Sequence, residues 1–330
     1  MELSEAAPRK RWVRPIVIAL IAVLVLTGSA AVFAGARYLG NIQRLSDVFA
    51  GLVDSNRPVG DDATTFLLAG SDSREPETDV AALGANGPAN QRADTLMLLR
   101  ISADGKSSQL ISIPRDSWVD VPGYGYNKIN AAYAFGGPAL LIKTVEQVTK
   151  VRVDHFAVVD FQGFKNITDL VGGVTIVSAG EYGLTRGAHH MSGEEALAYV
   201  RERKHLPNGD FDRVRRQQVY LRAMLREVKA QHVYKDPAKL DRILRAATSS
   251  IAVDDNLSYP EMVKLAMTLG GLNESDMSFF LAPVAGYGME GEQSVVYLDA
   301  IQCDVIFKLF REGKLGADSG FETLPPDPAV

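Results

Sequence analysis

Cysteine is nearly absent from this sequence, whose 330 residues include only Cys303. That count excludes an intramolecular disulfide framework and any zinc or iron–sulfur site that needs several cysteines. An excess of positive charge is also absent, because 35 Lys and Arg residues face 40 Asp and Glu residues and the formal net charge is −5. Binding to nucleic acid through bulk positive charge is therefore not expected. With 46% hydrophobic and 23% charged residues, the composition excludes collagen-like, wholly disordered and multi-span membrane classes.

Local motifs of several common enzyme classes are missing as well. The sequence has neither Gly-x-Ser-x-Gly nor His-Glu-x-x-His, which are the local signatures of many serine hydrolases and of zincin proteases. Both enzyme classes are therefore disfavoured. The run Gly105-Lys106-Ser107 resembles the end of a P-loop, but Arg100 occupies the position of the first glycine. We therefore expect a hairpin turn there.

One long apolar run stands near the N-terminus. Residues 15–36 carry no charged side chain, and as a helix they would be about 33 Å long, enough to span a bilayer. Four basic residues precede the run (Arg9, Lys10, Arg11 and Arg14). The positive-inside rule then predicts that residues 1–14 are cytoplasmic and that the rest of the protein is extracytoplasmic. A cleaved signal peptide is the alternative, because small alanines lie near the end of the run, but the length of the run favours an anchor.

Short apolar runs alternate with helical patterns along the rest of the chain. We expect strands at 65–69, 94–101, 109–113, 155–161, 174–177, 277–284 and 295–298, and helices at 163–171 and 192–199 and from about 138, 212, 236, 258 and 299. This alternation predicts a layered α/β domain. The predicted organisation is a cytoplasmic tail 1–14, a transmembrane helix 15–36, a stalk 37–63, an extracytoplasmic catalytic domain 64–316 and a disordered tail 317–330.

Basic residues gather between Arg201 and Lys229, where nine Lys or Arg residues face four acids. If a helix begins near Asp212, its apolar stripe packs on the core and an adjoining flank lines a cleft. That flank would hold Arg213, Arg216, Gln217 and Tyr220. Guanidinium groups at a helix N-terminus bind phosphate oxygens well, so a phosphate site is one interpretation. The other interpretation is a solvent-exposed basic face whose arginines and lysines pair with nearby acidic residues.

Two carboxylates, Asp72 and Asp94, stand at the end of one predicted strand and the start of another. Ligands bind at strand ends in α/β sheets, and Arg115 directly follows a third strand. Mg²⁺ takes one or two carboxylates and completes its shell with water and phosphate oxygens. Each feature alone is explained by a turn or a surface ion pair, but together they favour one site for a metal-bound pyrophosphate.

The ordered motifs of residues 66–225 resemble those of the LytR-CpsA-Psr proteins, membrane-anchored enzymes that build bacterial cell envelopes. The matching segments are Leu68-Ala69-Gly70-Ser71-Asp72-Ser73-Arg74, Arg92-Ala93-Asp94-Thr95, Ser112-Ile113-Pro114-Arg115-Asp116, Lys128-Ile129-Asn130-Ala131-Ala132-Tyr133, Asp169-Leu170-Val171-Gly172-Gly173-Val174, Gly193 to Arg203 and Asp210-Phe211-Asp212-Arg213 with Arg216-Gln217-Gln218. One departure is Asp212, where several members have glycine.

The resemblance implies a site built from specific residues. Asp72 and Asp94 match the magnesium carboxylates of the family, so Mg²⁺ is the expected cofactor. The implied pyrophosphate-binding set is Arg74, Arg115, Lys128, Arg201, Arg203, Arg213 and Gln217. Of these residues, Arg115 and Arg203, together with Asp94, are the expected catalytic groups. The implied fold is α/β, a three-layer α/β/α sandwich around a mixed sheet, with an apolar pocket for a lipid tail, which agrees with the layered α/β domain that the pattern predicts.

The implied reaction moves a phosphorylated glycan from a polyprenyl-pyrophosphate carrier to peptidoglycan outside the membrane. The expected partners are therefore that donor, the peptidoglycan acceptor and the bilayer, with no nucleic acid. A polyprenyl-pyrophosphate phosphatase would use the same anion site with water as acceptor, and a non-catalytic protein could bind the lipid carrier without turnover. A membrane-tethered transcription regulator is disfavoured, because the predicted topology places the domain outside the cytoplasm.

Overall fold

A central mixed sheet organises the protein in a computed structural model that describes residues 42–71, 93–202, 205–207, 209–230, 242, 245 and 251–324. The sheet has seven strands in the order β1-β10-β7-β2-β3-β4-β11. They are β1 (Gln43–Leu45), β2 (Thr64–Ser71), β3 (Ala93–Ile101), β4 (Ser108–Ile113), β7 (His155–Asp160), β10 (Ile251–Asp254) and β11 (Met277–Leu281). Three neighbouring pairs are parallel (β1 with β10, β2 with β7, β4 with β11) and three are antiparallel (β10 with β7, β2 with β3, β3 with β4), so the predicted mixed α/β sheet is confirmed.

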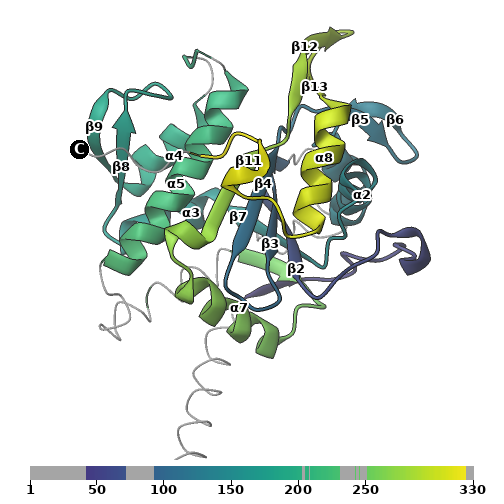
Figure 1. Cartoon of the computed structure of the whole chain (residues 1–330), viewed down its shortest axis with the longest axis horizontal. Coiled ribbons are helices and arrows are strands. Elements are labelled where there is room, and N and C mark those ends of the chain that lie inside the picture. The colour runs from purple at the N-terminus through teal and green to yellow at the C-terminus, as the bar shows by residue number, and fades with distance from the viewer. Residues whose placement is uncertain are drawn as a thin grey trace, which may run out of the picture.

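Helices cover both faces of this sheet (Figure 1). On one face lie α2 (Ala131–Thr149) and α8 (Ala300–Arg311). On the other lie α3 (Phe161–Leu170), α4 (Gly193–Arg201), α5 (Asp210–Ala230) and α7 (Tyr259–Gly271). Short 3₁₀ turns occur at Asp54–Asn56, Glu274–Asp276 and Ala317–Ser319.

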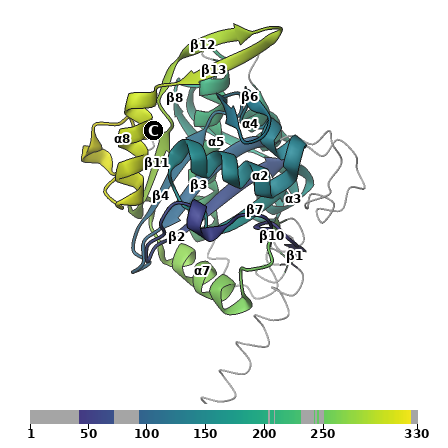
Figure 2. The same ribbon diagram turned by 90° about the vertical axis from the view of Figure 1, so that its right-hand side faces the viewer.

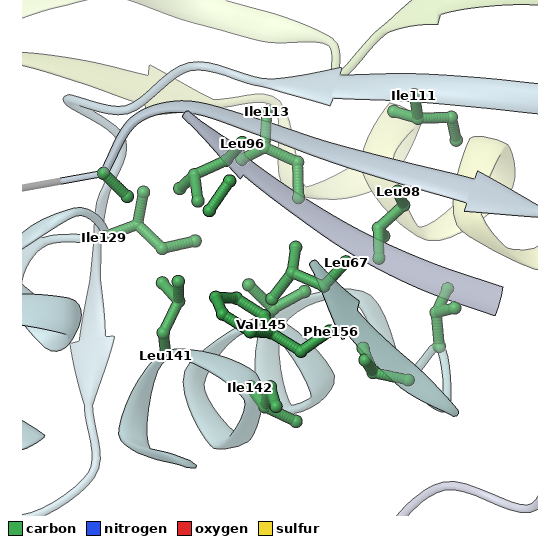
Figure 3. Packing of buried hydrophobic residues seen from close by; sticks show 14 of the residues in the cluster. Leu67, Leu96, Leu98, Ile111, Ile113, Ile129, Leu141, Ile142, Val145 and Phe156 are labelled. Atoms are coloured by element: carbon green, nitrogen blue, oxygen red, sulfur yellow. The ribbon is translucent and has the colours of Figure 1, made fainter. Parts of the chain in front are cut away.

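The alternation of side chains along each strand explains why both faces need cover. In β3, Leu96 and Leu98 point into one apolar cluster, whereas Met97 and Leu99 point into the other. Figure 3 shows the first cluster, in which Leu96 and Leu98 of the sheet lie on the side that faces Leu141, Ile142 and Val145 of α2. A strand that is apolar on both sides is stable only between two layers, because each buried Leu contributes about 1.5–3 kcal/mol.

Capping residues fix where several helices begin. Ser192 and Glu195 form a capping box before α4, and Ser258 and Glu261 form another before α7, as the sequence predicts. Asp299 accepts a hydrogen bond from the backbone N–H of Gln302 at the start of α8.

The helix predicted to begin at Gly136-Gly137-Pro138 begins earlier, at Ala131. Gly136 and Gly137 interrupt it, and Gly137 has φ 61°, a conformation that favours glycine. Pro138 then opens the second segment, where proline is tolerated. The sequence therefore predicted the second segment and missed the short turn before it.

Three antiparallel hairpins lie outside the central sheet. They are β5 (Trp118–Val121) with β6 (Gly125–Lys128), β8 (Val174–Ala179) with β9 (Arg186–Met191), and β12 (Val284–Glu290) with β13 (Gln293–Leu298). The sequence predicted β8 and most of β13, but it missed β5, β6, β9 and, apart from Val284, β12. β5 has only four residues, and the other three strands are rich in glycine or polar residues, so their alternation is weak.

The domain extends further at both ends than the sequence predicted. In the described part of the predicted stalk, β1 pairs with β10, and Leu45 and Val48 are buried. In the predicted tail, the backbone N–H of Leu324 donates to Phe279 O at 3.0 Å, so residues 317–324 cover the open edge of β11 instead of forming a disordered segment. The helix predicted at 15–36 lies outside the described residues, and of the helix predicted from 236 only residues 242 and 245 are described, both helical. No helix within the described residues is long and apolar enough to cross a membrane.

A buried ion pair fastens the segment before β2 to the end of α2. Arg57 Nη2 lies 2.7 Å from Glu146 Oε1, Arg57 Nε lies 3.1 Å from Glu146 Oε2, and Glu146 is 4% exposed. The Arg57 guanidinium also lies 5.0 Å from the centre of the Phe49 ring. Removing either charge would leave the other one buried without its partner.

We therefore expect Arg57→Ala to lower the free energy of unfolding by roughly 3 kcal/mol, measured by urea denaturation. The double substitution Arg57→Met with Glu146→Leu should recover most of that loss, because it removes both buried charges. A matched control is Arg152→Ala, whose pair with the exposed Asp54 (2.9 Å) should contribute less than about 1 kcal/mol. Equal effects of the two single substitutions would contradict this account.

Candidate functional site

The strands of the central sheet bring several chain segments to one edge. Ser71, at the end of β2, pairs with both Asp160 at the end of β7 and Ala93 at the start of β3. Leu96 of β3 pairs with Ile113, so β4 ends at the same edge, and the parallel strand β11 ends beside it. The end of β2, the start of β3 and the end of β4 therefore lie at the same edge, and strand ends are where ligands bind in α/β sheets.

Arg115 and Lys128 meet at this edge through one carboxylate. Asp116 Oδ1 lies 3.1 Å from Lys128 Nζ, and Asp116 Oδ2 lies 3.6 Å from Arg115 Nε. Backbone bonds hold the two segments together, because Asn130 N–H donates to Arg115 O at 3.2 Å. Two cations share one carboxylate, so this cluster keeps a net positive charge that favours an anionic ligand.

The first turns of α5 are fastened to the same edge. Gln218 is fully buried, and its amide donates to Ser112 Oγ at 3.0 Å and to Phe280 O at 2.7 Å, near the ends of β4 and β11. Phe211 and Val214 line a narrow apolar cleft that also includes Pro114, the residue before Arg115. Strand ends and helix start are thus held together by buried contacts.

Three further predicted residues lie around this junction. Arg213 lies in the first turn of α5 and is 5% exposed, and Gln217 follows one turn later. The Gln217 amide donates to Val200 O at 3.4 Å, close to the end of α4, where Arg201 is exposed. The helix partial charge at the start of α5 adds to the positive potential there. The fold therefore places Arg115, Lys128, Arg201, Arg213 and Gln217 around the same edge, and their binding roles stay predictions.

Several predicted site residues fall outside what the structure describes. Asp72 and Arg74 lie in the undescribed segment 72–92, and Arg203 lies in 203–204. Asp94 is the second residue of β3, so its backbone lies at the candidate edge, but its side chain is not described.

The sequence misplaced two residues on the flank of α5. Arg216 is buried, donates to Tyr182 O at 2.6 Å and to Tyr199 O at 3.0 Å, and lies 4.4 Å from the centre of the Tyr199 ring. Burial lowers the pKa of the Arg216 guanidinium from its ordinary value. Tyr220 lies in the core with its hydroxyl 2.7 Å from Thr168 Oγ1, and burial raises its pKa. Both stabilise the helical layer instead of lining a cleft.

Other functional contacts gave no signal in the sequence. Gln218 and Ser112 are 106 residues apart, and although both stand in segments that match the family, neither segment indicates that the two side chains meet. The sequence patterns indicate no role for Asp116, although its carboxylate lies 3.1 Å from Lys128 Nζ. Only adjacency of Asp116 to Arg115 could have suggested that it orients the cations.

A cavity of about 320 Å³ lies at the opposite edge of the sheet, and its chemistry differs from that of the candidate site. Arg100 contributes the guanidinium there, but both of its terminal nitrogens bond to Asp61 at 3.0 and 2.7 Å. That hydrogen-bonded guanidinium holds the pKa of Asp61 below its ordinary value. Because Asp62 and Glu312 also line the cavity, it does not suit a pyrophosphate.

A family model described as "LytR_cpsA_psr family" matches residues 43–309, most of the chain. The protein belongs to the LytR-CpsA-Psr family. The matched range begins at β1 and ends within α8, so it includes every strand of the central sheet and both faces. The resemblance inferred from the sequence motifs is thereby confirmed.

Relatives in this family are named for cell-wall biosynthesis. The chain is 32% identical over 300 residues to "Cell wall biosynthesis protein LcpA" of Corynebacterium glutamicum, with 78% of this chain and 57% of that protein covered. It is 33% identical to "Probable cell wall biosynthesis protein LcpB" of the same organism, with 75% and 61% covered. It is also 32% identical to "Polyisoprenyl-teichoic acid--peptidoglycan teichoic acid transferase TagU" of Bacillus licheniformis, with 67% and 72% covered. The chain thus spans less than two thirds of the two corynebacterial relatives.

Solved structures of LytR-CpsA-Psr proteins share the fold. The crystal structure of B. subtilis TagV is 26% identical, has a TM-score of 0.60 and matches 76% of this chain and 97% of that one. The structure of TagT bound to LIIa-WTA is 23% identical, also with a TM-score of 0.60, and matches 81% of this chain and 99% of that one. At that identity the second comparison supports the fold alone.

The contacts of Gln218 give a direct test of how the edge is held. We expect Gln218→Ala to lower the free energy of unfolding by about 1–3 kcal/mol, because Phe280 O loses its buried donor. The midpoint and slope of urea unfolding measure that change. A suitable control is Gln147→Ala, since Gln147 is exposed and bonds Asp120 at the surface, where effects stay within about 0.5 kcal/mol. Indistinguishable unfolding midpoints for the two variants would contradict a role of Gln218 in joining α5 to the ends of β4 and β11.

Proposed function

We propose that this protein is a Mg²⁺-dependent phosphotransferase that moves a phospho-glycopolymer from a polyprenyl-pyrophosphate carrier to peptidoglycan. The single observation that supports it most strongly is the gathering of cations from three segments, after β4, in β6 and at the start of α5, around one sheet edge. Membership of the LytR-CpsA-Psr family and the printed name of TagU agree with this assignment.

The proposed chemistry needs charge stabilisation more than covalent help. A hydroxyl of the acceptor sugar attacks the sugar-bearing phosphorus in line, a new P–O bond forms, and the anhydride P–O bond breaks. Polyprenyl phosphate leaves, and the hydroxyl proton passes to a carboxylate at the edge, for which Asp94 is the candidate. Negative charge spreads over the phosphoryl oxygens in the transition state, so Arg115, Arg203 and Arg213 stabilise it. The energy resides in the existing anhydride, and no nucleotide is needed.

The donor set at the edge suits a divalent cation. Ser71 and Ala93 are paired on neighbouring strands, and each directly precedes a carboxylate in the sequence, Asp72 and Asp94. Mg²⁺ needs only one or two carboxylates when substrate phosphates complete its shell. Asp72 and Asp94 would hold the ion, which would neutralise part of the diphosphate charge.

We also propose that residues 15–36 anchor the protein in the cell membrane as a single span, with the N-terminus in the cytoplasm and the catalytic domain outside. The uncharged run and the basic residues before it support this topology. An anchored domain would meet a lipid-linked donor at the membrane surface, where that donor is confined.

Substituting the cations tests the anion site. We expect Arg115→Ala and Arg213→Ala each to lower the rate of glycopolymer transfer to peptidoglycan fragments by roughly 10²-fold or more, because each removes charge stabilisation of the transition state. The measurement is transfer from a synthetic lipid-linked oligosaccharide, with the diester product identified by mass spectrometry. Release of free phospho-oligosaccharide without a diester would indicate the phosphatase instead.

The matched control for these variants is Arg186→Ala, because Arg186 is an exposed arginine on the β8–β9 hairpin. It should retain the rate of the unmodified protein. If all three variants had the same rate, the edge would not be the anion site.

Metal dependence is tested with the two carboxylates. Chelation should abolish transfer by the unmodified protein, and Mg²⁺ should restore it. The double variant Asp72→Ala with Asp94→Ala should be inactive with and without Mg²⁺, and its Mn²⁺ affinity, measured by electron paramagnetic resonance, should fall at least about tenfold. Full Mg²⁺-dependent activity of the double variant would rule out these metal ligands.

A further inference from the structure

Two hairpins project from the sheet beside the candidate site, β5–β6 and β12–β13 (Figures 1 and 2). They are joined at their base, because Ser117 forms a bridge with Val296 and Val296 N–H donates to Asp116 O at 2.9 Å. Asp116 is the carboxylate between Arg115 and Lys128. Both hairpins therefore begin at the cationic edge and extend outward from it.

Large apolar side chains are exposed on both hairpins. Tyr126 is 67% exposed, Tyr287 is 60% exposed and Met289 is 62% exposed. Behind the tip of β5–β6, Tyr124 stacks on Phe135 with ring centres 4.8 Å apart, which supports that tip on α2. Exposed apolar side chains grouped on neighbouring elements mark a contact surface.

The exposed rings lie on the faces that lead to the site. Tyr126 and Lys128 alternate with Asn127, so they share a face of β6, and Lys128 reaches Asp116 from that face. Tyr287 lines the apolar cleft that contains Pro114 and Phe211, at the start of α5. A ligand that covers both rings would thus run past the cationic edge.

The charge of the hairpins selects against an anionic ligand. From Val284 to Leu298 the chain carries Glu290 and Glu292 and no lysine or arginine. In β5–β6 the sole cation is Lys128, which lies at the base of the hairpin and belongs with Arg115 to the candidate site, so the outer part of this hairpin carries no cation. Anionic lipid headgroups and polyanionic glycopolymers would be repelled, whereas a neutral, hydroxyl-rich chain would not.

We propose that the two hairpins form a platform, consisting of Tyr126, Tyr287 and Met289, that binds the neutral glycan chain of the acceptor. Sugar rings present apolar C–H faces that stack on aromatic rings, and their hydroxyl and amide groups hydrogen-bond to carboxylates and amides such as Glu292 and Gln293. This inference rests on the proposed function, because it assigns the acceptor to a surface next to the donor site. The platform would hold the acceptor hydroxyl beside the diphosphate.

The test is binding of a labelled, un-cross-linked peptidoglycan glycan strand to the full-length protein, measured by fluorescence anisotropy without any donor. Tyr126→Ala and Tyr287→Ala should each weaken binding by roughly three- to tenfold, and Tyr126→Phe and Tyr287→Phe should restore it. The control Val59→Ala removes a side chain that is 94% exposed in the segment before β2, at the opposite edge of the sheet, and should leave the affinity unchanged. Thermal unfolding checks that the alanine variants remain folded.

Unchanged glycan affinity in both alanine variants would overturn the platform. Loss of binding to phosphatidylglycerol vesicles together with unchanged glycan affinity would assign these rings to the membrane surface and would also overturn it. Because no donor is present, the result is independent of catalysis. If the strand binds as expected but no diester forms with donor added, the proposed function fails while the platform stands.

Discussion

Convergence of cations from three parts of the chain is the physical constraint on which the proposed site depends. Arg115 and Lys128 share the carboxylate of Asp116, and Arg213 lies in the first turn of α5, which packs beside the same strand ends. Like charges that are brought together repel, so contacts within the fold must hold these segments in place. The side chain of Gln218 in α5 donates hydrogen bonds to Ser112 Oγ and Phe280 O. The carboxylate of Asp116 forms ion pairs with both Arg115 and Lys128.

Arginines in α5 illustrate how similar residues take different roles within one helix. Arg216 bonds to the carbonyl oxygens of Tyr182 and Tyr199 and supports the packing of α4 on α5. Arg215 lies 3.0 Å from Glu322 and 3.2 Å from Gln218, so it ties the helix to the C-terminal segment. Arg213, three residues earlier than Arg216, instead lies in the first turn, at the candidate edge. The role therefore follows from position along the helix and not from residue type.

Local chemistry allowed much of the fold to be predicted from the sequence. Capping at Ser192 and Ser258 and the apolar runs of β2, β3 and β4 depend on neighbouring residues alone. Other features depend on residues far apart in the chain. They are the hydrogen bond of Gln218 to Phe280, the burial of Arg216 beside Tyr182, and the pairing of Leu324 with β11. Such contacts form only when the sheet order is set, so no local pattern reveals them. The family was predicted correctly for a similar reason. Its motifs, like the apolar runs that indicate strands, are short segments that can be recognised without knowing the fold.

The most direct measurement of the central claim is the affinity of the full-length protein for a short-chain prenyl diphosphate compared with the corresponding monophosphate, by titration calorimetry in detergent. If distant cations converge on a single diphosphate, one molecule of diphosphate should bind per chain, at least about tenfold more tightly than the monophosphate. Equal affinities for the two ligands, or several weak sites per chain, would contradict convergence.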